Sequence, residues 1–271
     1  MYRILIKPFV RRMNPEKASR VALQYFKIVG KIPGGRFLSR FFLYNNRASK
    51  LQREVFGLNF YNPLGLGAGL DRKGELYNDL NDLGFSFSEI GPLDAKGIRK
   101  ALKKIQEDPQ NDILAACINR DYLTAFTLAY DFCDFFVIEI NSDTGTEDLD
   151  PLLDARLTND VYKPIVIKLP EGYPEDETED IVKYCMLNGF DGIQARSLEQ
   201  IRTIRKISAG RLPIMANARI TTPKQAYDML EAGASLIEVR SGLVYEGPSL
   251  IGKMLKYLES HIPEENGGIQ N

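Results

Sequence analysis

Histidine and cysteine are scarce in this chain. The only histidine is His261, near the C-terminal end, and we expect it to be a solvated residue on the last helix. A histidine-based catalytic triad and a metal site with several histidines are therefore excluded, and no metal site is expected. The three cysteines, Cys117, Cys133 and Cys185, include no CxxC pair, which favours reduced thiols in the cytoplasm.

Long apolar runs and a large net charge are also absent. Because no run reaches about 18 apolar residues, no segment is expected to cross a bilayer. The N-terminus has no apolar region followed by a small-residue cleavage site, so secretion is not expected. A net charge of −1 gives no general argument for nucleic-acid binding. The expected location is the cytoplasm, with peripheral contact to the inner face of the cell membrane considered for the first segment.

Basic residues gather in the first 47 residues, where the only acid is Glu16. Asn14, Pro15 and Glu16 are typical of a helix start, and a second short helix is expected around 37–42. Two short basic amphipathic helices suit an anionic membrane surface. The alternative is a helical cap that packs on the rest of the protein and leaves its basic face in water.

From about residue 50 onward, short apolar runs alternate with helical patterns. This alternation predicts parallel strands joined by crossover helices, and eight units fit a closed (β/α)8 TIM barrel, an α/β fold. A doubly wound open sheet is less favoured because no GxGxxG follows the first strand. The expected strands are 63–68, 85–90, 112–118, 134–140, 164–168, 191–195, 213–216 and 235–240, and the expected helices include 97–106, 177–188, 198–208, 222–232 and 248–260.

This pattern divides the chain into three parts. Residues 1–47 form the amphipathic helical segment, 48–262 the barrel and 263–271 a disordered tail. Active sites of such barrels form where the strands end. The predicted strand ends carry charged residues almost throughout, namely Arg72, Arg120, Glu139, Lys168, Arg196, Arg219 and Arg240.

The first predicted barrel strand ends in small residues and a charged turn. Gly67, Ala68 and Gly69 lack bulk, so a flat ligand could lie against the backbone there. Together with Val166-Ile167-Lys168 and the run 232–248, this stretch resembles the quinone-dependent (class 2) dihydroorotate dehydrogenases. The resemblance extends from the N-terminal helices to Leu250. It implies a TIM barrel with an N-terminal helical pair, an FMN cofactor, and oxidation of dihydroorotate to orotate in pyrimidine biosynthesis with quinone as electron acceptor.

The resemblance also implies roles for individual residues. Ser142 corresponds to the catalytic base and Lys168 to the lysine that touches the flavin, while Arg72 stands near the orotate where the family has lysine. The implied FMN contacts are Gly67, Ala68, Gly91, Lys168, Ser241 and Gly242, the last two at the phosphate.

Several positions depart from the family pattern. Where the family has a Gly-Gly pair at the phosphate after strand seven, this chain has Ala216-Asn217-Ala218-Arg219, and the arginine side chain would occupy that space. The hairpin after strand two is missing, and Glu139 and Thr144 replace asparagines that flank the base. We therefore expect a non-catalytic or altered-ligand homologue with lost or strongly reduced dihydroorotate oxidation. The alternative is an active FMN-dependent dihydroorotate dehydrogenase, either alone or completed by a partner chain.

Arg219 and Arg240 are candidate anion ligands. If both point to one corner, they could hold a small anion or a phosphorylated ligand. The alternative is an ion-pair network that fills an emptied cavity, with acids drawn from Glu89, Glu139, Asp143 and Glu171. The sequence identifies no protein partner.

Overall fold

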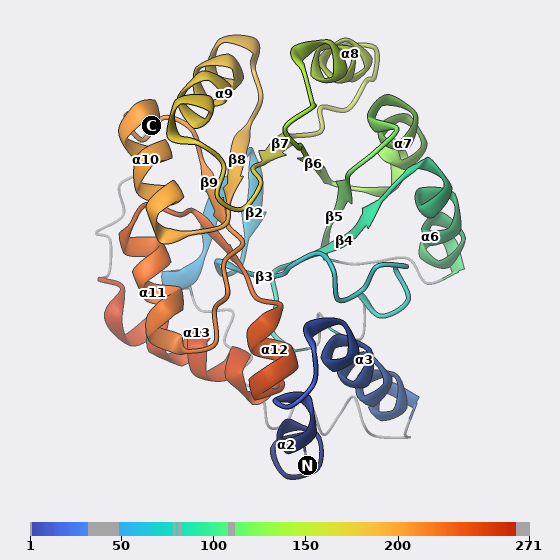
Figure 1. The fold of residues 1–271 in the computed structure, drawn as a ribbon, viewed down its shortest axis with the longest axis vertical. Coiled ribbons are helices and arrows are strands. Elements are labelled where there is room, and N and C mark those ends of the chain that lie inside the picture. The colour runs from blue at the N-terminus through green and yellow to red at the C-terminus, as the bar shows by residue number, and fades with distance from the viewer. Residues whose placement is uncertain (1, 32–48, 78–79, 81–82, 108–111, 264–271) are drawn as a thin grey trace.

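Eight parallel strands close into a barrel in the order β10-β3-β4-β5-β6-β7-β8-β9 (Figure 1). The computed structural model describes residues 2–31, 49–77, 80, 83–107 and 112–263. The predicted TIM barrel is confirmed, and each strand overlaps its predicted range. The strands are β3 (Leu64–Leu66), β4 (Phe87–Leu93), β5 (Ile113–Ile118), β6 (Phe135–Glu139), β7 (Ile165–Lys168), β8 (Gly192–Ala195), β9 (Ile214–Ala216) and β10 (Leu236–Glu238).

Helices follow the strands and surround the barrel (Figure 1). The five helices named from the sequence are confirmed, with ends that differ by two residues at most. Two begin with side-chain caps, since Ser197 accepts from the Gln200 amide and Thr222 from the Gln225 amide. The helices are α6 (Ala95–Glu107), α7 (Tyr122–Ala129), α8 (Thr146–Leu157), α9 (Glu175–Asn188), α10 (Leu198–Ser208), α11 (Pro223–Glu231), α12 (Ser241–Glu246) and α13 (Ser249–His261), with short 3-10 turns η1 (Ser49–Leu51) and η2 (Tyr130–Phe132).

We call the end of the barrel where the parallel strands begin the lower end, and the end where they finish the upper end. A short antiparallel hairpin, β1 (Arg53–Val55) and β2 (Leu58–Phe60), closes the lower end. The ring of Phe60 lies 5.4 Å from that of Phe87 and 6.4 Å from that of Phe135, centroid to centroid. The hairpin was not among the predicted strands, because each of its strands buries a single residue, Val55 or Phe60, and lacks the apolar run that marks the barrel strands. It belongs to an apolar cluster inside the barrel that also includes Val137, Val166, Met215 and Leu236.

Three N-terminal helices pack beside α12: α1 (Tyr2–Leu5), α2 (Lys7–Val10) and α3 (Pro15–Lys31) (Figure 1). The predicted start of α3 is confirmed, because Asn14 Oδ1 accepts from the Lys17 amide at 2.9 Å. The buried Tyr2 hydroxyl donates to the Val244 carbonyl, and Lys7 and Arg11 both pair with Glu246. These helices therefore cap the barrel at the side where β10 ends.

Two predictions concern residues that the structure does not describe. The second helix around 37–42 lies wholly outside the described residues, and the predicted tail 263–271 lies outside them beyond Pro263. His261 is exposed at the end of α13, as predicted. Among the helices that the structure describes, none combines the length and the apolar character needed to span a membrane.

Candidate functional site

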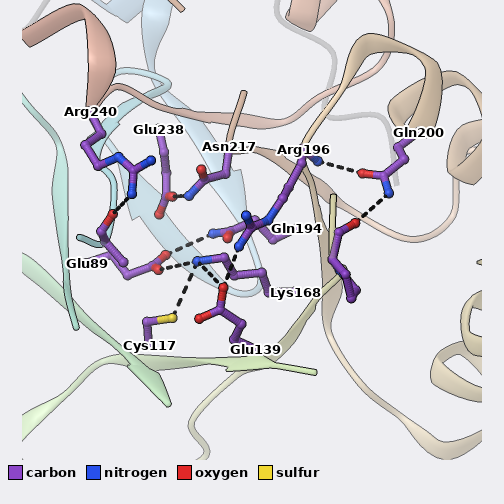
Figure 2. A network of polar contacts seen from close by, with 12 residues as sticks. Glu89, Cys117, Glu139, Lys168, Gln194, Arg196, Gln200, Asn217, Glu238 and Arg240 are labelled. Atoms are coloured by element: carbon purple, nitrogen blue, oxygen red, sulfur yellow. Dashed lines mark hydrogen bonds and ion pairs between the residues drawn. The ribbon is translucent and has the colours of Figure 1, made fainter. Parts of the chain in front are cut away.

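The upper end of the barrel interior is filled by polar side chains (Figure 2). Side chains alternate between the two faces of a strand, so residues two apart point to the same side. Two positions above the apolar residues Phe87, Val166 and Leu236, the interior carries Glu89, Lys168 and Glu238. The full set, which we call the mouth network, consists of Glu89, Cys117, Glu139, Lys168, Gln194, Arg196, Asn217 and Glu238.

Lys168 lies at the centre of the mouth network. Its Nζ is 3.5 Å from Glu139 Oε1, 3.9 Å from Glu89 Oε1 and 3.6 Å from Cys117 Sγ. Burial by itself would lower the pKa of Lys168, but the neighbouring acidic side chains, Glu89 and Glu139 among them, outweigh it and raise that pKa. Lys168 is therefore a cation paired with acidic side chains of the same chain. Glu89 and Glu139 were among the acids that the ion-pair alternative named.

The remaining members connect the network across the barrel. Arg196 forms an ion pair with Glu139, and Gln194 Nε2 donates to Glu89 Oε2 at 2.9 Å. Asn217 donates to Glu238 from the end of β9. Figure 2 shows these side chains converging from β4, β6, β7, β8 and β10 on one small space.

Complete burial, and after it the neighbouring Glu89 side chain, raises the pKa of Glu238 well above its usual range. Glu89 and Glu139 lie beside Lys168, and Glu139 also pairs with Arg196. Pairing of opposite charges lowers the cost of burying them.

The small residues at the end of β3 make room for these side chains. A methyl group at Gly67 would lie 3.0 Å from Glu238 Oε2, and one at Gly69, where φ is +101°, would lie 2.5 Å from Arg240 Nη1. The Ala68 carbonyl accepts from Arg240 at 3.3 Å. The space over this backbone, which the FMN implied by the resemblance would need, is filled by Glu238 and Arg240. The residues present do not fit the flavin in this structure.

Two other glycines implied as FMN contacts serve close packing. Gly91 has φ +111°, and a methyl group there would lie 2.5 Å from the Cys117 carbonyl. A methyl group at Gly242 would lie 2.5 Å from the Ile220 carbonyl. Ser241, the first residue of the six-residue α12, is partly buried and lines a cavity beneath α3.

Ser142 lies apart from the mouth network. It is exposed in the turn after β6, where the Asp143 amide donates to Asn141 Oδ1 at 2.8 Å. Its hydroxyl donates to Asp143 Oδ1 at 3.4 Å. The structure therefore does not bring Ser142 together with Lys168, and its role as a base stays a prediction.

The two candidate anion ligands line different cavities. Arg240 lines one of about 560 Å³ that also contains Arg72. Arg219 lines a neighbouring cavity of about 520 Å³, and its guanidinium carbon lies 5.5 Å from the ring centroid of Tyr245, which borders both cavities. Arg72 and Arg240 are thus brought together, whereas Arg219 is not.

Sequence reasoning had named neither Glu238 nor Gln194 as a site residue. Both lie two positions beyond an inward-facing residue, Leu236 in β10 and Gly192 in β8. The alternation of the strands could have identified them, had the inward face been followed to each strand end.

Comparison with known proteins finds similarity to dihydroorotate dehydrogenases over most of the chain. A family model described as dihydroorotate dehydrogenase matches residues 177–262. The dihydroorotate dehydrogenase (quinone) of Christiangramia forsetii is 28% identical over 331 residues, which cover 93% of this chain and 96% of that protein. The enzyme of the same name from Sulfurimonas denitrificans is 26% identical, with 91% and 90% covered. Since the first alignment is longer than this chain of 271 residues, that relative has stretches with no counterpart here.

Solved structures share the fold. The ligand-free DHODH from Eimeria tenella has a TM-score of 0.74 at 18% identity, covering 92% of this chain and 96% of that one. The complex of DHODH from the same organism with ferulenol has a TM-score of 0.69 at 17% identity, with 90% of each chain covered. At these identities the likeness concerns the fold alone.

Proposed function

We propose that this chain, which belongs to the dihydroorotate dehydrogenase family, is a homologue in which dihydroorotate oxidation is lost or strongly reduced. The observation that carries the proposal is the filled barrel mouth. Glu238 and Arg240 lie against Gly67, Ala68 and Gly69, the backbone on which the resemblance puts FMN. Without space for the flavin, the chain has no electron acceptor for the reaction.

The residues that the resemblance assigns to proton and charge transfer support the same proposal. Serine is a weak base that needs a prepared environment, and Ser142 is exposed beside Asp143. Lys168 is already engaged by Glu89 and Glu139. After β4 the chain enters α6 at Ala95 within two residues, so nothing replaces the missing hairpin at that point.

A second candidate function is an active FMN-dependent dihydroorotate dehydrogenase, completed by a partner chain. It is favoured by the relatives named dihydroorotate dehydrogenase (quinone), which align over most of this chain and most of their own length. This function requires Glu238 and Arg240 to leave the space over Gly67 and Gly69 when flavin binds.

The two candidate functions predict different visible spectra for the purified protein and different turnover of dihydroorotate. The test is to purify the full-length protein after expression with ample riboflavin, record its visible spectrum, and assay dihydroorotate with an artificial electron acceptor. We expect a colourless protein that stays colourless when FMN is added and shows no turnover above background. Near-stoichiometric flavin with robust turnover would reject the proposal and support the second candidate function, the active oxidoreductase.

The N-terminal helices are proposed to rest on an anionic membrane surface. Ile4 is 77% exposed, Phe9 62% and Ile28 61%, and the exposed basic residues Arg12 and Lys17 lie on the same segment. Apolar side chains flanked by cations are suited to the interface of an anionic bilayer.

This surface can be tested by vesicle sedimentation. The double variant Ile4→Ser/Phe9→Ser should bind vesicles that contain anionic lipid about tenfold more weakly than the unchanged protein, because buried apolar area is lost. Leu187→Ser is the matched control, since Leu187 is 84% exposed on α9, away from the N-terminal helices. An equal loss of vesicle binding in both variants, or binding that does not depend on the anionic lipid, would contradict the proposed surface.

A further inference from the structure

We propose that a second copy of this chain docks with its N-terminal helices on the outer face of α8 and α9. The docking surface contains four exposed apolar side chains at or just beyond the C-terminal ends of these helices. We call it the α8–α9 patch, and it consists of Leu157, Val161, Tyr162 and Leu187. The contact lies on the outside of the barrel, so it goes beyond the proposed function and does not depend on whether flavin binds.

The α8–α9 patch is one continuous surface, because hydrogen bonds join its two helices. Arg156 donates to the Gly189 carbonyl and to Asp191 Oδ2, each at 2.8 Å, and so ties the end of α8 to the turn after α9. The Tyr162 hydroxyl donates to Asp191 Oδ1 at 2.6 Å. The guanidinium carbon of Arg156 also lies 4.5 Å from the ring centroid of Tyr162. The exposed apolar side chains are therefore carried on a fixed framework.

The patch includes the most exposed apolar side chains of the described residues. Leu157 is 80% exposed and Leu187 84%. Burying apolar area stabilises whatever complex covers it, and exposed apolar side chains that gather in one place mark interaction surfaces. A partner that covers both leucines therefore gains affinity.

Acidic residues surround the α8–α9 patch. Between residues 143 and 180 the chain has twelve aspartates and glutamates, all of them exposed, whereas its three cations there are buried or half-buried. Asp154 and Asp160 lie three positions before and after Leu157. Within the described ranges, neither forms a salt bridge. The partner must therefore bring positive charge together with apolar side chains.

The N-terminal helices of the same chain provide this combination. Ile4, Leu5 and Phe9 are exposed on α1 and α2. Arg12 and Lys17 are exposed on the same segment, and neither has an acidic partner among the residues whose structure is described. The N-terminal surface thus matches the α8–α9 patch in apolar character and opposes it in charge, which favours a second copy as the occupant.

The two surfaces lie at opposite ends of the molecule (Figure 1). A contact between different surfaces at opposite ends cannot close between two copies, so it continues as a ring or an open chain. The net charge of the whole chain is only −1, so little overall repulsion opposes the association. We therefore expect a head-to-tail series whose size grows with protein concentration.

Sedimentation velocity of the full-length protein, over a range of micromolar concentrations, is the first test. We expect the mean sedimentation coefficient to rise with concentration at about 0.05 M salt. The rise should be weaker at about 0.5 M salt, because salt screens exposed charges. A sedimentation coefficient that stays that of a monomer at every concentration in low salt would overturn the proposal.

Mixing two variants identifies the surfaces that meet. Leu157→Ser/Leu187→Ser alters the α8–α9 patch, and Ile4→Ser/Phe9→Ser alters the N-terminal surface. All four side chains are exposed, so both variants should fold, which circular dichroism checks. Each variant alone should associate at least about tenfold more weakly than the unchanged protein, since buried apolar area is lost. An equal mixture should form a complex of two chains and nothing larger, because each variant retains the surface that the other lacks.

Two further variants separate this contact from general surface effects. Leu123→Ser is the matched control, because Leu123 is exposed on α7 outside both surfaces, and it should leave the association unchanged. Asp154→Asn/Asp160→Asn should weaken the association by a smaller factor and reduce its dependence on salt.

Three results of the variant experiments would overturn the proposal. They are an equal mixture that remains monomeric, an Ile4→Ser/Phe9→Ser variant that associates as strongly as the unchanged protein, or an equal loss in Leu123→Ser. The second result would indicate a dimer formed by two α8–α9 patches. Failure here is separate from failure of the proposed function, because the visible spectrum and the turnover assay report on the barrel mouth, whereas sedimentation reports on the outer surface.

Discussion

The lower half of the barrel interior is packed with aromatic and aliphatic side chains, whereas the upper half, built on the same strands, is packed with charges. Phe87 and Glu89 share β4, and Leu236 and Glu238 share β10, so two residues separate the two environments. Apolar burial stabilises the lower half directly. In the upper half, desolvation offsets most of the attraction between charges, so those residues contribute little net stability. The comparison indicates that the lower half provides most of the stability of the barrel, whereas the upper half can vary in its chemically active side chains.

The largest expected effect is in the lower half. Phe135→Ala removes a fully buried ring that contacts Phe56, Phe60 and Phe87, and should lower the free energy of unfolding by about 3–5 kcal/mol. Urea unfolding followed by circular dichroism measures this loss. A loss below about 1 kcal/mol would mean that the lower half is not the stabilising one.

In the upper half, removal of one partner should be costly although the intact network contributes little. Lys168→Met leaves the Glu89 and Glu139 carboxylates without their shared cation, and should destabilise the protein by about 3 kcal/mol. Adding Glu89→Gln should recover part of that loss, because one uncompensated charge disappears. A double variant less stable than Lys168→Met would show that Glu89 stabilises the fold independently of Lys168.

A smaller effect is a pH dependence that belongs to the upper half alone. The folded-state pKa of Glu238 is raised by burial and by Glu89, so its contribution to stability is fully present below its unfolded pKa near 4.5 and is lost as pH rises through the folded value. Glu238→Gln, which stays neutral, should remove this contribution and make the protein relatively more stable at alkaline pH. Urea midpoints measured from pH 5 to pH 9 for both proteins provide the test. Parallel profiles would contradict the raised pKa of Glu238.

The smallest effect is expected at the rim. Ser142→Ala changes an exposed turn residue and should alter the free energy of unfolding by less than about 0.5 kcal/mol. Any residual dihydroorotate turnover should also be unchanged, because Ser142 lies apart from Lys168. A residual activity that disappears in this variant would assign the catalytic base to Ser142 and favour the active enzyme.

Local patterns were sufficient to predict most of the barrel. Each strand from β3 to β10 was found from its apolar run, and the start of α3 from Asn14, Pro15 and Glu16. The β1–β2 hairpin was not predicted because each of its strands buries only one residue and so has no apolar run. Of the network acids considered from the sequence, Glu89 and Glu139 are members, whereas Asp143 lies in the exposed turn with Ser142.

The sequence by itself determined the barrel class and the positions where charged residues end the strands, because the periods of strands and helices are local properties of the chain. The tertiary structure alone decided which of those charges meet. Pairing of β10 with β3 brings Glu238 and Arg240 against Gly67 and Gly69, which lie far away in the chain. The tertiary structure also places Arg219 and Arg240 in different cavities, although they follow the neighbouring strands β9 and β10. Such contacts depend on barrel closure and on the direction of each side chain, which no local pattern contains.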